Sequence, residues 1–84
     1  MLIRSQFDQD EVNLCNIDNV FNITVEKNLV ESDSNKMFLI MAVRNGDDDI
    51  ILGGFKTRDR AVFIISTMYE MYRVGQRCYQ IPEE

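Results

Sequence analysis

The sequence contains no histidine, the side chain that most often serves proteins as a general base or as a metal ligand. It contains only two cysteines, Cys15 and Cys78, and two thiolates cannot complete the four-ligand shell of a structural zinc ion. Without a histidine, neither cysteine has the usual partner that activates a nucleophile. We therefore expect a non-enzymatic protein with no catalytic residues, no metal and no cofactor.

Long apolar runs are also missing from the sequence. No stretch approaches the roughly 20 apolar residues that a membrane-spanning helix needs, and residues 1–6 lack the basic and apolar regions of a signal peptide. We therefore expect a cytoplasmic protein that does not bind membranes. In that reducing compartment Cys15 and Cys78 should be inert, buried thiols, with a disulfide between them as the alternative.

Basic residues are scarce, because 9 Lys and Arg stand against 14 Asp and Glu, for a net charge of -5. Phosphate contacts need clustered positive charge, so this balance works against nucleic-acid binding. The 84 residues are 45% hydrophobic, which is typical of a folded chain. A chain of this length is expected to form a single domain, residues 1–84, with a modest core.

Helical apolar spacing is confined to residues 57–72. Thr57 can cap the start of this helix, Asp59 stands in its first turn, and Gly75 can end it behind Arg73. Apolar residues recur at the i, i+3, i+4, i+7 spacing that places them on one inward stripe. The predicted stripe consists of Ala61, Ile64, Ile65, Met68, Met71 and Tyr72.

The residues before this helix have the patterns of short strands. Residues 21–26 alternate apolar and polar without exception, and Asn45 with Gly46 forms the positive-φ pair that tight hairpins prefer. Paired Gly53 and Gly54 predict a bulge, a bend or a close approach of another segment. The predicted strands are residues 2–7, 12–15, 21–26, 37–43, 50–55 and a short last one at 78–81. The order predicts an α+β fold, a meandering antiparallel sheet of about five strands with the C-terminal helix packed across it.

Residues 37–43 are apolar at every position, which predicts a strand buried on both faces, with a buried helical segment as the alternative. One helix can cover only one face of a sheet. Two alternatives follow: the sheet curls into a half-barrel similar to a reduced pleckstrin-homology-like fold, or its second face meets another protein chain.

The helix carries apolar residues on its outward side as well. On an ideal helical wheel, Phe63, Thr67 and Val74 lie opposite the inward stripe. Contiguous exposed apolar residues mark interfaces, so we expect a homodimer joined by this helix line or by the sheet face. The candidate interface residues are Phe63, Thr67, Val74, Met37, Leu39 and Met41.

Two clusters of charged residues are weaker candidates for ion binding. Lys56, Arg58 and Arg60 at the helix entrance could contact an anion near the amides of Gly53 and Gly54, although the spacing departs from the phosphate-binding pattern GxxxxGK[ST]. The alternative is a solvated helix rim. Residues 47–49, three aspartates, could form part of a calcium loop, but they lack the EF-hand spacing and fit a solvated hairpin tip.

Several short motifs resemble those of a group of small bacterial and phage-borne proteins. An IRSQ-type opening, an LG-x-[YF]-x-T-x-x-[RE]-A segment and a C-terminal Y-x-[MI]-P recur in that group in the same order. The matching residues here are 3–6, 13–14, 16–17, 52–57, 60–61 and 79–84. The group has no assigned activity, so the resemblance implies a bacterial or prophage setting and no mechanism.

The expected function is therefore protein–protein interaction, as a homodimer, with a host protein as a further candidate partner. The alternative is an acidic phage-type inhibitor that occupies a nucleic-acid-binding site on a host protein. Clustering of its carboxylates on one surface would favour that alternative. Those carboxylates are Asp47, Asp48, Asp49, Glu83 and Glu84.

Overall fold

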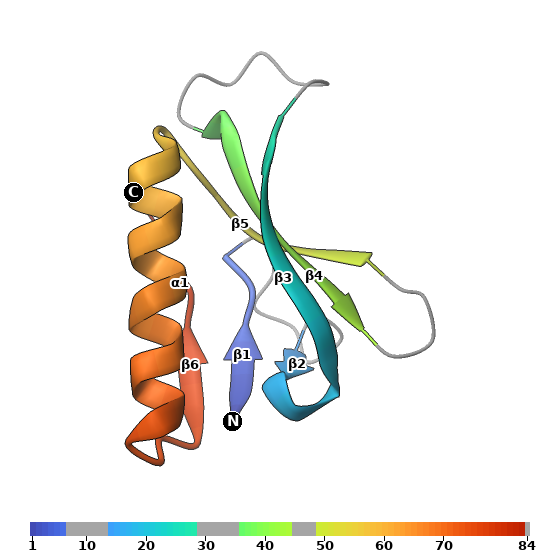
Figure 1. Cartoon of the computed structure of the whole chain (residues 1–84), viewed down its shortest axis with the longest axis vertical. Coiled ribbons are helices and arrows are strands. Elements are labelled where there is room, and N and C mark those ends of the chain that lie inside the picture. The colour runs from blue at the N-terminus through green and yellow to red at the C-terminus, as the bar shows by residue number, and fades with distance from the viewer. Residues whose placement is uncertain (7–13, 29–35, 45–48, 84) are drawn as a thin grey trace.

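The computed structural model describes residues 1–6, 14–28, 36–44 and 49–83. They form six strands, one 3-10 turn and one C-terminal helix, so the predicted α+β class is confirmed (Figure 1). In chain order the elements are β1 (Leu2–Arg4), β2 (Leu14–Asn16), η2 (Ile17–Asn19), β3 (Val20–Lys27), β4 (Phe38–Arg44), β5 (Asp49–Phe55), α1 (Arg58–Arg73) and β6 (Cys78–Gln80). The predicted Asn45-Gly46 turn and the aspartates 47 and 48 lie outside the described residues.

The strands divide between two sheets. β3, β4 and β5 form the expected antiparallel meander, whereas β1 lies between β2 and β6 in a second sheet. The prediction of one meandering sheet was therefore wrong, and so was the curled half-barrel. The reason is that α1 carries the chain back to its first strand, so that β6 pairs with β1 in parallel and not with β5. Where β1 ends, the Gln6 amide donates to the Leu52 carbonyl of β5 at 2.7 Å and links the two sheets.

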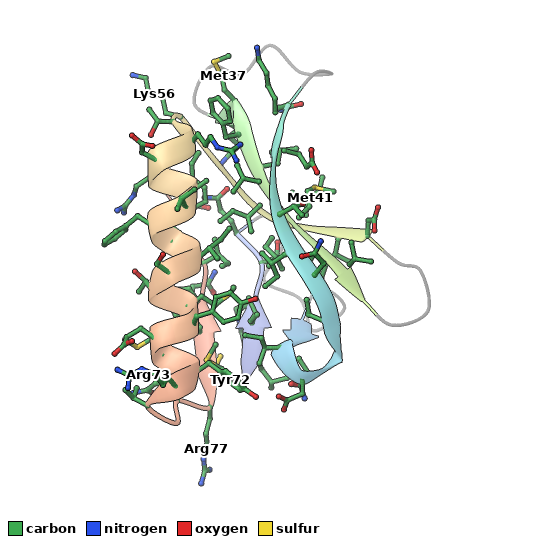
Figure 2. All side chains as sticks on the ribbon, in the orientation of Figure 1. Met37, Met41, Lys56, Tyr72, Arg73 and Arg77 are labelled. Atoms are coloured by element: carbon green, nitrogen blue, oxygen red, sulfur yellow. The ribbon has the colours of Figure 1, made fainter. Side chains whose placement is uncertain are left out.

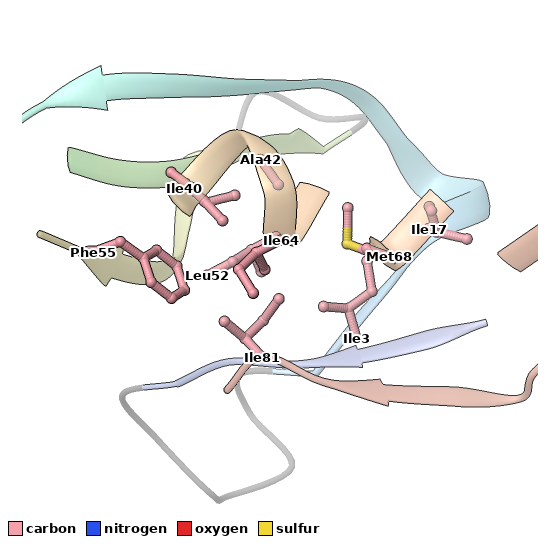
Figure 3. Close-up of a cluster of buried hydrophobic side chains, with 10 residues drawn as sticks. Ile3, Ile17, Ile40, Ala42, Leu52, Phe55, Ile64, Met68 and Ile81 are labelled. Carbon is pink, nitrogen blue, oxygen red and sulfur yellow. The ribbon is translucent and has the colours of Figure 1, made fainter. Parts of the chain in front are cut away.

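The core lies between the two sheets and α1 (Figure 3). Ile40 and Ala42 of β4 face the helix, and Ile3 reaches the same cluster from the second sheet. Burying one such aliphatic side chain completely contributes about 1.5–3 kcal/mol. The buried cluster consists of Ile3, Ile17, Ile40, Ala42, Leu52, Phe55, Ala61, Ile64, Met68 and Ile81.

Helix α1 begins and ends as its sequence predicts. The Thr57 hydroxyl accepts a hydrogen bond from the Arg60 amide at 3.1 Å, which satisfies one of the orphan donors of the first turn. At the other end Gly75 has a φ of 87°, and its amide donates to the Tyr72 carbonyl while the Gln76 amide donates to that of Met71. These two bonds form a Schellman motif.

The inward stripe of α1 is narrower than predicted. Its buried members are Ala61, Ile64 and Met68, and Ile65 packs half-buried beside them. Tyr72 was predicted to face the core but is 44% exposed. Its hydroxyl donates to the Asp18 carboxylate of η2 at 2.6 Å, because at the end of the helix the phenol can reach a charged acceptor at the surface.

The paired glycines of β5 show the expected bulge and close approach. Ile40 lies opposite Gly53 and Met41 opposite Ile51, so Leu52 is the extra residue of the bulge. A Cβ atom on Gly53 would lie 2.8 Å from Cγ2 of Ile81. The lack of a side chain at this position therefore lets the C-terminal segment pack onto β5.

The two cysteines flank β1 from opposite sides. Cys15 of β2 lies opposite Ile3, and Cys78 of β6 lies opposite Leu2. Strands that flank a third strand are about 9–10 Å apart, whereas the Cα atoms of a disulfide lie within about 7 Å. Cys78 is accordingly a free thiol, as predicted, but it is exposed and not buried.

Candidate functional site

The face of the β3–β4–β5 sheet that points away from α1 carries an apolar strip that the helix does not cover; we call it the outer sheet face (Figure 2). It carries Leu39, Met41 and Val43 of β4, all half-buried, and Ile51 of β5, which is 42% exposed. The strand at 37–43 was predicted to be buried on both faces. Only its inner face is buried, through Ile40 and Ala42.

Polar side chains of β3 border this apolar strip. Pairing places Asn22 opposite Val43, Thr24 opposite Met41 and Glu26 opposite Leu39. Residues directly opposite each other in an antiparallel pair point to the same face. The outer sheet face is therefore an apolar strip of β4 and β5 with a polar margin along β3. Met37, the third predicted sheet residue, precedes β4 and is 39% exposed.

The predicted helix line is exposed but interrupted. Phe63 is 57% exposed, and the guanidinium of Arg60 lies 5.3 Å from the centre of its ring. Glu70 lies on the same line between Thr67 and the exposed Val74, and it forms an ion pair with Arg73. These charges break the apolar line into separate residues, which need no interface to explain them.

The structure does not bring the two predicted surfaces together. Phe63, Thr67 and Val74 lie on the outside of α1, whereas Met41 lies on the opposite side of the sheet (Figure 2). A single contact with one partner can therefore use one set or the other but not both.

The basic residues at the helix entrance lack the support that was predicted for them. Lys56 and Arg58 are exposed there, but the Gly54 amide donates to Oε1 of Gln6 at 2.9 Å and is buried. The Thr57 hydroxyl, in turn, is an acceptor for the Arg60 amide. Two groups that an anion site would use are thus engaged within the chain, and an anion contact at Lys56, Arg58 and Arg60 remains a prediction.

Gln6, which the sequence analysis marked only as part of the opening motif, is the centre of a largely buried hydrogen-bond network. Gln6 is only 3% exposed. Its Oε1 accepts from the Gly54 amide and from Nζ of Lys36 at 2.7 Å, and its Nε2 donates to the Pro82 carbonyl at 2.8 Å. One amide thus ties the N-terminal strand, β5 and the C-terminal segment together, with one bond assisted by charge.

This network joins segments that the sequence motifs had marked separately. Ser5 and Gln6 come from the opening motif, Gly53 and Gly54 from the motif before the helix, and residues 81–82 from the C-terminal motif. The Ser5 hydroxyl adds a bond to the Ile51 carbonyl at 3.2 Å. All of these contacts are made within the chain, so the network holds the fold together. The motifs marked these segments one by one, but the sequence could not show that they meet at the side chain of Gln6.

Two phenols have perturbed acidity. The hydrogen bond from Tyr72 to the Asp18 carboxylate raises the pKa of Tyr72, because ionisation would place two negative charges side by side. Burial raises the pKa of Tyr79, and the positive charge of Arg60 lowers it by less. Both phenols stay protonated at neutral pH and can act there as hydrogen-bond donors.

The acidic residues do not gather on one surface where the structure describes them. Asp49 is the first residue of β5. Glu83 follows Pro82, and the side chain of Gln6 joins the Pro82 carbonyl to the Gly54 amide near the other end of β5. Asp49 and Gly54 are five residues apart along the strand, which corresponds to about 17 Å. Asp47, Asp48 and Glu84 lie outside the described residues.

The described residues contain no group of three or more acidic, cysteine or histidine side chains arranged to hold a metal ion. No helix among them has the length and apolar content needed to cross a membrane.

Comparison with protein-family models, with curated proteins and with solved structures gives no match to this chain. The fold and the surfaces described above are therefore the basis for any assignment of function.

Proposed function

We propose that this chain is a non-enzymatic protein that acts through protein–protein contacts, and that it works as a homodimer joined on the sheet side of the molecule. The observation that carries the proposal is the outer sheet face, where Leu39, Met41, Val43 and Ile51 form a contiguous apolar strip that α1 does not cover. Contiguous apolar surface of this kind is more characteristic of interfaces than scattered exposed residues are. The helix side also exposes large apolar residues, but charged side chains, among them the Glu70–Arg73 ion pair, lie between them.

The polar network supports the non-enzymatic part of the proposal. Catalytic groups keep donors or acceptors directed at a substrate. The Gln6 amide instead uses its oxygen and its nitrogen on Gly54, Lys36 and Pro82 of the same chain. The free and exposed thiol of Cys78 fits the reducing cytoplasm that we take as the setting. The bacterial or prophage origin is supported by the motif resemblance alone.

Light scattering at several protein concentrations, on wild type and on Phe63→Glu, tests this proposal. We expect wild type to approach twice the chain mass of 9.8 kDa. Phe63→Glu should have the same mass, because its side chain lies on α1, away from the sheet side. A monomer at every concentration would refute the homodimer. A dimer that Phe63→Glu breaks would move the interface to the helix and refute the sheet side.

A further inference from the structure

The edge of the β3–β4–β5 sheet has a surface of a different kind, made of main-chain groups. β3 is the longest strand of the described residues, with eight residues, and it stands first in the order β3-β4-β5. Among the described residues it pairs only with β4. An edge strand presents a row of unpaired N–H and C=O groups, whose chemical complement is another strand.

One hydrogen bond fixes which residues of β3 face this open edge. The Asn28 amide donates to the Met37 carbonyl at 2.8 Å, continuing the register in which Lys27 lies opposite Phe38. Bonding alternates along an antiparallel strand, so Glu26, Thr24 and Asn22 also direct their amides and carbonyls toward β4. The main-chain groups of Ile23, Val25 and Lys27 consequently point to the open edge.

The middle of this edge carries none of the features by which proteins protect exposed strands. Residues 22–25 contain no proline, no charge and no irregularity, since the register shift of β3 lies between Val20 and Asn22. Charged side chains appear only at its end, at Glu26 and Lys27. A stretch of edge without proline, bulge or inward charge, such as residues 22–25, is a template for pairing.

We propose that two copies of this chain pair antiparallel along β3, with Thr24 of one copy directly opposite Thr24 of the second, to form one continuous six-stranded sheet from the two three-stranded ones. This inference rests on the homodimer of the proposed function, but it places the contact at the β3 edge, beside the outer sheet face and not on it. The two-fold axis passes between the two threonines, perpendicular to the sheet. The outer sheet faces of both copies then lie side by side on the same side of the dimer.

The register follows from the direction of the main-chain groups and from the facing side chains. Only residues that point to the edge can exchange hydrogen bonds, so a symmetric pairing must be centred on a residue and not between two residues. Centring on Thr24 places Ile23 opposite Val25, which is a favourable β-branched pair, and Asn22 opposite Glu26, which can be hydrogen-bonded. Centring on Val25 would instead place Ile23 opposite Lys27.

Disulfide trapping tests this register. In a background of Cys78→Ser, which removes the exposed thiol, we compare Thr24→Cys with Asn22→Cys as the matched control on the same strand and face. The threonines form a non-hydrogen-bonded pair, with Cα atoms about 4.5 Å apart, which a disulfide can span. The two Asn22 positions are displaced by four residues along the strands, about 13 Å, which is beyond its reach.

We expect mild oxidation to convert most of the Thr24→Cys variant into covalent dimer and to leave Asn22→Cys close to the Cys78→Ser background.

Light scattering of Met41→Glu separates edge pairing from contact between two outer sheet faces. The edge-paired dimer keeps its mass in this variant, because Met41 lies on β4, opposite Thr24 and one strand inward from the edge that pairs.

The outcomes that overturn the inference differ from those that overturn the proposed function. A dimeric wild type whose Thr24→Cys variant traps no better than Asn22→Cys, or whose Met41→Glu variant becomes monomeric, refutes edge pairing and leaves the homodimer in place. A monomeric wild type refutes both.

Discussion

Replacing Gln6 by leucine should destabilise the fold more than any other single polar substitution at this network. Leucine has a similar volume, so the main effect is the loss of three side-chain hydrogen bonds, to Gly54, Lys36 and Pro82. The buried Gly54 amide loses its acceptor, at a cost of about 1–3 kcal/mol. The Pro82 carbonyl and the Lys36 ammonium belong to half-buried residues, so both groups can form hydrogen bonds with water instead. Loss of their two bonds to Gln6 adds about 1 kcal/mol in total.

The expected loss in the free energy of unfolding is therefore about 2–4 kcal/mol. An 84-residue domain has a total of roughly 4–13 kcal/mol, so the change is a large fraction. Urea unfolding followed by circular dichroism measures it, with all variants at one protein concentration because self-association adds to apparent stability.

Gln6→Glu separates the bonds that the side chain of Gln6 accepts from the bond that it donates. Its carboxylate keeps an acceptor for the Gly54 amide and for Nζ of Lys36, but it loses the donor to the Pro82 carbonyl. We expect a loss smaller than that of Gln6→Leu and confined to the tether of the C-terminal segment. A Gln6→Leu variant within about 0.5 kcal/mol of wild type would show that the network does not hold the sheets together.

Two further predictions concern the helix end and the alkaline range. Gly75→Ala should cost about 1–2 kcal/mol in urea unfolding, because its φ of 87° is left-handed while no atom lies within 4 Å of an added Cβ; a cost equal to that of Gln76→Ala would contradict this. Tyr79→Phe should flatten the alkaline loss of stability. The raised pKa of Tyr79 in the fold stabilises wild type below the unfolded value of 10.0, and this contribution is lost as the pH rises through the folded pKa. Urea midpoints at about pH 9 and about pH 11 measure it, and parallel declines in both proteins would refute it.

The parts of the fold that depend on local sequence could be predicted. Thr57 and Gly75 mark the ends of α1 because capping uses neighbouring residues, and the alternation of residues 21–26 gives a strand because one face is buried. Tyr72 was misplaced because an ideal wheel cannot distinguish the core from the edge of a stripe, where Asp18 offers the hydroxyl an acceptor.

The pairing of distant strands could not be predicted. Nothing in residues 78–80 distinguishes β1 from β5 as a neighbour, because strand pairing uses main-chain groups that all residues share. The candidate interface residues Met37, Leu39 and Met41 were chosen from their apolar run, but the run could not tell a doubly buried strand from one with an uncovered face. Gln6 was missed because its role depends on partners up to 76 residues away.

The parallel pair β1–β6 has a consequence for how the protein is made. Ile3 lies opposite Tyr79, so a ribosome adding roughly 5–20 residues per second finishes the second partner about 4–15 s after the first. The β3–β4–β5 meander has only local connections and can form during this interval. During this interval one edge of β1 has no partner strand, and Ile3 lacks its contact with the core cluster that Ile81 completes. We expect β1 to be among the last strands to gain both of its native neighbours, and the nascent chain to be most open to chaperones until then.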